Sequence, residues 1–100
     1  MRADGKLLYM SRGPIPTNKV DRFERAWRQV CVYAFPKEAL AAFAASPAKT
    51  PLEQIEDIEI LRFLELGWEV RMVGMSDESV AVDSPEDVLV AEAAIRARGL

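Results

Sequence analysis

Residues 79–87, Ser-Val-Ala-Val-Asp-Ser-Pro-Glu-Asp, restrict the fold of this 100-residue chain more than any other segment. The two valines alternate with small residues, which is typical of a buried or half-buried strand. Ser84 is a good N-cap, Pro85 suits the first helical position, and Asp87 stands where a capping box has its acid. The segment therefore predicts a strand that passes directly into a helix.

Asp83 falls at the carboxyl end of this predicted strand. Open α/β sheets bind their ligands at that edge. A carboxylate there is suited to holding a hard divalent cation beside a phosphate. The alternative is that Asp83 only helps to cap the helix, and the spacing alone slightly favours this second interpretation.

Composition and charge exclude several classes of function. The net charge is −3 and no cluster of lysine or arginine is present, so nucleic acid is not an expected partner. The longest apolar run, residues 39–45, is too short to span a membrane, and no secretory signal is recognisable. Cys31 is the single cysteine and histidine is absent, which excludes an internal disulfide, a zinc site and a histidine base. We expect one cytoplasmic domain over residues 1–100, in which any metal has oxygen ligands.

The remaining pattern predicts an α/β fold, a mixed or parallel sheet with flanking helices. Within residues 28–34, Gln29, Cys31 and Tyr33 are expected on one side and the valines on the other. Cys31 is interpreted as a small core residue. Strands are expected at 7–10, 28–34, 68–73 and 79–82, and helices at 36–45, 50–66 and 85–98; residues 19–27 fit either a short helix or a loop.

Two features of this pattern point to binding. Arg12 lies between a strand end and a rigid, proline-rich loop, where it can bind an anion; the alternative is a solvated surface arginine. Four acids, Glu53, Glu56, Asp57 and Glu59, gather in the first half of the helix at 50–66. Acids near a helix N-terminus suit the helix dipole, and the sharper interpretation is that one of them faces a polar ligand.

Three separated segments resemble the C-terminal part of the 3-deoxy-manno-octulosonate (Kdo) cytidylyltransferases. Residues 8–16 read Leu-Tyr-Met-Ser-Arg-Gly-Pro-Ile-Pro, similar to that family's Leu-Tyr-Phe-Ser-Arg-x-x-Ile-Pro. Residues 51–62 resemble its Pro-Leu-Glu-x-Ile-Glu…Glu-Gln-Leu-Arg helix, and residues 82–87 its Val-Asp-Thr-Pro-Glu-Asp motif. The three motifs occur in the family's order and with similar spacing across nearly the whole chain.

This resemblance implies that the fold is the C-terminal portion of a Rossmann-like nucleotide-diphospho-sugar transferase. It also implies a reaction in which CTP is coupled to a 2-keto sugar acid and pyrophosphate is released. Magnesium would be the cofactor, and the resulting CMP-sugar would serve lipopolysaccharide or capsule synthesis. Asp83 matches the family's metal ligand, and Tyr33 and Glu59 match positions that contact the sugar. Arg12 lies in a family motif and would pair with an anionic part of the substrate.

Two departures from the family concern the sugar pocket. Gln29 stands where the family usually has histidine, and Ile60 where it usually has glutamine. Such changes remove hydrogen bonds on which a specific sugar hydroxyl would depend. One hypothesis is therefore a modified sugar, such as an amino-substituted Kdo. The alternative is drift, with the same sugar bound by a differently filled pocket.

No segment resembles the family's N-terminal CTP-binding half, and Asp4-Gly5, a hairpin turn signal, follows no recognisable strand. We therefore expect a sugar-binding and dimer-forming portion that is inactive alone unless another chain supplies the nucleotide half. An exposed sheet edge would favour a homodimer or a higher oligomer. A non-catalytic dimerising module and an acylneuraminate-type cytidylyltransferase remain as alternatives.

Overall fold

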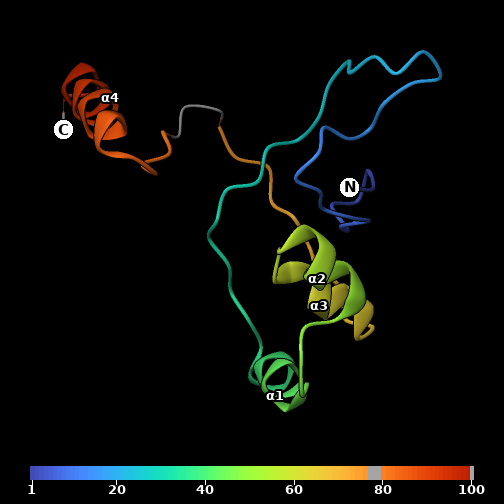
Figure 1. Ribbon diagram of the computed structural model, residues 1–100. Helices are drawn as coiled ribbons and strands as arrows, with labels where there is room; N and C mark the ends of the chain where they lie inside the picture. The colour runs from blue at the N-terminus through green and yellow to red at the C-terminus, as the bar shows by residue number, and fades with distance from the viewer. Residues whose placement is uncertain (77–79, 100) are drawn as a thin grey trace.

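The computed structural model describes residues 1–76 and 80–99. Among these residues there are four helices and almost no strand (Figure 1). Helices α2 and α1 each pack against α3, whereas α4 lies apart from them and has no buried residue. The helices are α1 (Lys37–Ala45), α2 (Pro51–Glu56), α3 (Ile60–Glu65) and α4 (Pro85–Ala97).

The hydrophobic core gathers around α3. Leu61 is fully buried, and Phe63 stacks on both Phe35 and Phe43 at 5.0 Å between ring centroids. Burial of apolar side chains is the main favourable term in folding, so this cluster anchors the amino-terminal segment, α1 and the α2–α3 pair to one another. The buried apolar residues are Leu7, Met10, Ala39, Ile58, Ile60, Leu61 and Phe63.

One antiparallel pairing joins the amino-terminal segment to the chain after α3. The Leu7 amide donates to the Val70 carbonyl at 2.8 Å, and the Met72 amide donates to the Gly5 carbonyl at 2.7 Å. Gly5 has φ +89°, and a Cβ there would lie 2.9 Å from the Met72 carbonyl oxygen. Only glycine fits both requirements. The Asp4-Gly5 turn is thus confirmed, and the strands predicted at 7–10 and 68–73 meet only over residues 5–7 and 70–72.

The predicted mixed sheet does not form among the described residues. In residues 28–34 the Val32 amide donates back to the Val30 carbonyl at 2.8 Å, and the Val32 side chain is 78% exposed. A strand needs a neighbour's backbone groups, and the described residues pair in this way only at the isolated antiparallel bridges Lys6 to Arg71 and Thr17 to Phe23. The strand predicted at 79–82 forms no ladder over its described part, and Ser79 lies outside the described residues. Residues 19–27 form a loop and no helix.

The single helix predicted over residues 50–66 is divided at Asp57. This residue has a left-handed backbone, φ +54°, which ends α2 before α3 begins. Ile55, near the end of α2, is 76% exposed. Gly67, at φ +91°, ends α3 as predicted, and the Trp68 amide closes the turn on the Phe63 carbonyl at 2.9 Å.

The helices α1, α2 and α4 begin close to where the sequence analysis predicts a helix start. Capping boxes begin α2, with Thr50 and Glu53, and α4, with Ser84 and Asp87. Helix α1 follows Pro36 as predicted, and Ala39 is its buried residue. In the part of the chain that the structure describes, no helix is long and apolar enough to cross a membrane.

Candidate functional site

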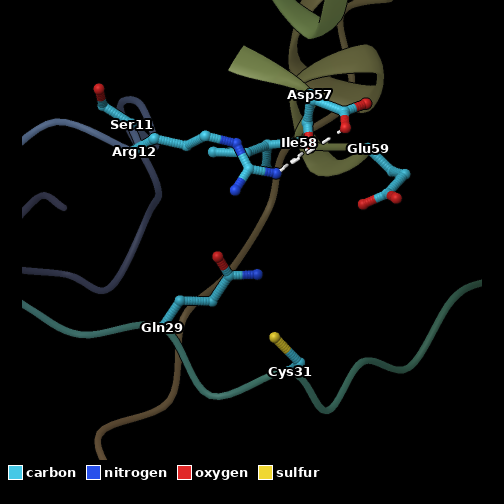
Figure 2. Close-up of a pocket in the computed structure, with 7 residues that line it drawn as sticks. All are labelled: Ser11, Arg12, Gln29, Cys31, Asp57, Ile58 and Glu59. Atoms are coloured by element: carbon cyan, nitrogen blue, oxygen red, sulfur yellow. Dashed lines mark hydrogen bonds and ion pairs between the residues drawn. The ribbon is translucent and has the colours of Figure 1, made fainter. Parts of the chain in front are cut away.

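A pocket of about 340 Å³ lies where three segments distant in sequence meet (Figure 2). The loop after Met10, residues 29–31 and the α2–α3 junction each contribute side chains to it. Three residues predicted to bind substrate, Arg12, Gln29 and Glu59, are among those that line it. The complete lining is Ser11, Arg12, Gln29, Cys31, Asp57, Ile58 and Glu59.

Arg12 is held by the end of α2. Its Nε donates to the Glu56 carbonyl and its Nη2 donates to the Asp57 carbonyl, the latter at 2.8 Å. Terminal helix carbonyls carry partial negative charge, so a guanidinium is stabilised there. A guanidinium has five N–H donors, and no described residue accepts from Nη1. Arg12 is therefore oriented by α2 and keeps donors for an anion in the pocket (Figure 2).

Asp57 carries the negative charge beside this arginine. Its carboxylate pairs with the Lys49 ammonium, and its Oδ2 lies 4.0 Å from Nη2 of Arg12. The hydrogen bond and charge of Lys49, followed by the charge of Arg12, lower the pKa of Asp57. Asp57 is thus ionised at neutral pH, and its left-handed backbone presents both its carbonyl and its carboxylate to Arg12.

Two residues of the segment at 29–33 lie at the pocket, whereas Tyr33, predicted to contact the sugar, is outside its lining and packs against the hydrophobic core. Gln29 and Cys31 line the pocket, and the Tyr33 hydroxyl is buried without a hydrogen-bond partner among the described residues. Burial raises the pKa of Tyr33, and the neighbouring Cys31 and Glu59 raise it further. Tyr33 is therefore a neutral hydroxyl close to Glu59. The predicted division of this segment into two faces is seen only in part: Gln29 and Cys31 share the pocket, but Cys31 and Val32 are both exposed and Val30 is half-buried.

Two expectations about the pocket are wrong. Cys31 is exposed and lines the pocket, so it is not a core residue. Ile60 was expected in the pocket but is only 3% exposed and belongs to the core, because α3 starts after the break at Asp57 and turns this residue inward.

Ser11 and Ile58 also line the pocket and were not predicted as binding residues, whereas Asp57 was one of the four acids of which one was expected to face a polar ligand. The alternation that places Gln29 and Tyr33 together could have identified Cys31 as well. The sequence did not predict how Asp57 reaches the pocket, because its place depends on a helix break that the capping pattern does not indicate.

Asp83 is not brought to this pocket. Its amide donates to the Asp87 carboxylate at 3.0 Å, whereas its own carboxylate makes no hydrogen bond or ion pair with a described residue. It precedes α4, which lies apart from the other helices (Figure 1). Within residues 1–76 and 80–99 no group of three or more His, Cys, Asp or Glu side chains could hold a metal ion. The roles of Asp83 in metal binding and catalysis stay predictions.

Comparison with known proteins identifies relatives, although no protein-family model matches the chain. The 3-deoxy-manno-octulosonate cytidylyltransferase of Chlorobium luteolum is 38% identical over 97 residues, which cover 96% of this chain and 38% of the relative. The enzyme of the same name from Chlamydia abortus is 41% identical over 85 residues, covering 85% of this chain and 33% of the relative. The enzyme of the same name from Myxococcus xanthus is 38% identical over 97 residues, which cover 96% of this chain and 39% of the relative.

The chain thus spans between a third and two fifths of the length of these relatives. Nearly all of it is similar to one portion of each of them, and the resemblance predicted from its three motifs is confirmed.

Proposed function

We propose that this chain, which is similar over nearly its whole length to one portion of the 3-deoxy-manno-octulosonate cytidylyltransferases, forms the sugar-binding part of such an enzyme. The reaction joins CTP to a 2-keto sugar acid, Kdo or a modified Kdo, and releases pyrophosphate. The product is a CMP-sugar for lipopolysaccharide or capsule. We further propose a cytoplasmic homodimer or higher oligomer whose complete sheet is Rossmann-like.

One observation carries this proposal: Arg12, Gln29 and Glu59 come from three separate segments and line a single pocket. A sugar acid presents one carboxylate and several hydroxyls. Arg12 can bind the carboxylate through its open donors, because the α2 carbonyls already fix its orientation. Glu59 can accept from a hydroxyl, and the Gln29 amide can donate or accept. Few polar groups placed around a small cavity are typical of a ligand site.

In the proposed reaction, the anomeric hydroxyl oxygen of the sugar attacks the α-phosphorus of CTP, and the bond to pyrophosphate breaks. The described residues would bind and orient the sugar for this attack. Arg12 would hold the carboxylate, and the Tyr33 hydroxyl, which is buried without a partner among the described residues, would hydrogen-bond a sugar oxygen beside Glu59. The nucleotide site would be formed by the portion of the relatives that this chain does not span.

Asp83 fits magnesium as a single ligand. In phosphate sites this ion takes one or two carboxylates and fills its other positions with phosphate oxygens and water. The Asp83 side chain is exposed and unpaired among the described residues, so it can serve as one such carboxylate. When bound, magnesium would neutralise charge on the phosphates.

The pocket can be tested through Cys31, which is the only cysteine and lines the cavity. Iodoacetamide should alkylate this exposed thiol, and Kdo should slow the reaction by occupying the pocket. Arg12→Ala should remove this protection, whereas Arg25→Ala, in an exposed loop, should leave it intact. An alkylation rate that saturating Kdo does not change would contradict the assignment of the pocket.

Catalysis is tested by pyrophosphate release from CTP, magnesium and Kdo. The chain is assayed together with the remaining portion of the Chlorobium luteolum relative, produced as a separate polypeptide. Turnover is expected only for the mixture, and Asp83→Ala should abolish it. The adjacent Glu86→Ala, which changes an exposed acid of α4, is the matched control. Turnover that survives Asp83→Ala would exclude the predicted role of Asp83.

The same two assays separate the alternatives. The first alternative is a non-catalytic dimerising module. It would be supported by a stable dimer without turnover in the mixture. With an acylneuraminate-type enzyme, N-acetylneuraminate would protect Cys31 from alkylation and would be turned over in the mixture. Kdo would do neither. Faster turnover of an 8-amino Kdo than of Kdo would support the hypothesis that the substrate is a modified sugar.

A further inference from the structure

Lys49 and Asp57 form an ion pair beside the pocket. The Lys49 ammonium donates a hydrogen bond to Oδ1 of Asp57. The other carboxylate oxygen, Oδ2, lies 4.0 Å from Nη2 of Arg12, which is too far for a hydrogen bond (Figure 2). The Asp57 carboxylate thus lies between two cations and hydrogen-bonds the lysine. This hydrogen bond favours the charged form of both partners, because Asp57 raises the pKa of Lys49 and Lys49 lowers the pKa of Asp57.

The short helix α2 brings this pair together. Lys49 precedes the Thr50 cap, and Asp57 directly follows Glu56, the last residue of α2. Six helical residues rise only about 9 Å, so the lysine side chain can lie along the helix and reach Asp57. A helix dipole favours acids at its start and bases at its end. Lys49 and Asp57 stand the other way round, so the dipole does not account for either charge.

The donors that Arg12 keeps open include one that Asp57 could take. Nε of Arg12 donates to the Glu56 carbonyl, and Nη2 donates one N–H to the Asp57 carbonyl. A carboxylate is bound most firmly by two parallel N–H groups, and with Nε occupied that pair is formed by Nη1 and Nη2. If Oδ2 of Asp57 came within hydrogen-bond distance of Nη2, it would take the second N–H of this nitrogen and break the pair.

We propose that Lys49 is a positioning residue, which holds the Asp57 carboxylate away from Nη2 and so leaves Arg12 open to the carboxylate of a sugar acid. This inference rests on the proposed function, and it adds a residue that acts on the substrate only through Asp57. Without Lys49, the Asp57 carboxylate would compete with the sugar for Arg12. The pair is exposed to solvent, with side-chain exposures of 43% for Lys49 and 66% for Asp57, so the expected effect on binding is about threefold.

A double-mutant cycle tests this role, and the concentration of Kdo that halves the alkylation rate of Cys31 measures binding. Lys49→Met should raise that concentration about threefold, and Lys49→Arg, which can still pair with Asp57, should restore it. Asp57→Asn should keep the bend, because asparagine accepts a left-handed backbone, and should bind Kdo at least as tightly as the unaltered chain. In the Asp57→Asn background, Lys49→Met should have no further effect. Lys37→Met, at an exposed lysine that begins α1, is the matched control and should bind Kdo normally.

A second measurement needs no sugar. The Nη protons of Arg12, followed by NMR in the chain alone, should exchange with water about threefold more slowly in Lys49→Met, since Asp57 then pairs with them. The double variant should exchange like the unaltered chain. The inference is overturned if Lys49→Met leaves this exchange unaltered. It is also overturned if Lys49→Met weakens Kdo binding equally in both backgrounds, because Lys49 would then act directly through its charge. If Kdo does not protect Cys31 in the unaltered chain, the proposed function fails, and the exchange at Arg12 still decides the role of Lys49.

Discussion

Arg62 of α3 binds both carboxylate oxygens of Glu53 of α2, with Nε 2.6 Å from Oε2 and Nη2 2.8 Å from Oε1. The Glu53 residue is 1% exposed, and the Arg62 guanidinium also lies 3.8 Å from the centroid of the Phe43 ring. This paired contact ties the capping box of α2 to α3 and to α1, which supports the junction where Arg12 and Asp57 meet.

Glu53→Gln should destabilise the protein by about 3–5 kcal/mol, because it leaves the Arg62 charge without its partner in a poorly solvated site. Urea unfolding followed by circular dichroism measures the change. Glu69→Gln is the matched control, since Glu69 pairs with Lys6 at 2.9 Å with a side chain that is 73% exposed, and it should shift the unfolding midpoint little. Equal effects of the two substitutions would show that burial of the Glu53 pair does not matter.

Stability should fall on acidification. The Arg62 hydrogen bond, despite burial and with help from the Thr50 amide, holds the pKa of Glu53 below its ordinary value of 4.5. A carboxyl whose pKa is lower in the folded state stabilises the protein above its unfolded pKa. That contribution is lost as the pH falls through the lower folded value. The free energy of unfolding should therefore decrease below about pH 4.5, and a constant value down to pH 3 would contradict this.

Ser84→Ala should selectively loosen α4. This helix has no buried residue, so its capping box is a principal source of its stability, and loss of the cap costs about 1 kcal/mol. Amide exchange in α4 should become faster while exchange in α3 stays unchanged. Ser46→Ala, which changes a serine that donates only to the Ala48 carbonyl, is the control. Unchanged exchange in α4 would mean that contacts other than the cap hold the helix.

Local sequence signals predicted what local contacts decide. The capping boxes at Thr50 and Ser84 and the stop at Gly67 lie where their residues require, because each is satisfied within a few positions of the chain. The strands were predicted from alternation, and alternation does place Gln29 and Cys31 on one face. A ladder also needs a second backbone, and no described backbone pairs with residues 28–34; the two antiparallel bridges of the described residues, Lys6 to Arg71 and Thr17 to Phe23, lie elsewhere.

The site was predicted in part for the same reason. Motif resemblance identified Arg12, Gln29 and Glu59, which share the pocket, but it did not indicate the helix break at Asp57. The left-handed Asp57 brings its own side chain into the pocket and turns Ile60 into the core. Asp83 depends on where α4 sits, and α4 makes no buried contact that would fix its place among the described residues.

Arg12→Lys should weaken sugar-acid binding at least tenfold although the charge is kept. The guanidinium donates to the Glu56 carbonyl from Nε and to the Asp57 carbonyl from Nη2, and it still has donors for a carboxylate. An ammonium is a single point charge and cannot hold the helix end and a carboxylate in one plane, so it would remain with the α2 carbonyls and Asp57. The concentration of Kdo that halves the alkylation rate of Cys31 measures the loss. Arg25→Lys, at a loop arginine, should leave that concentration unchanged, and an unaltered value for Arg12→Lys would show that charge alone is enough.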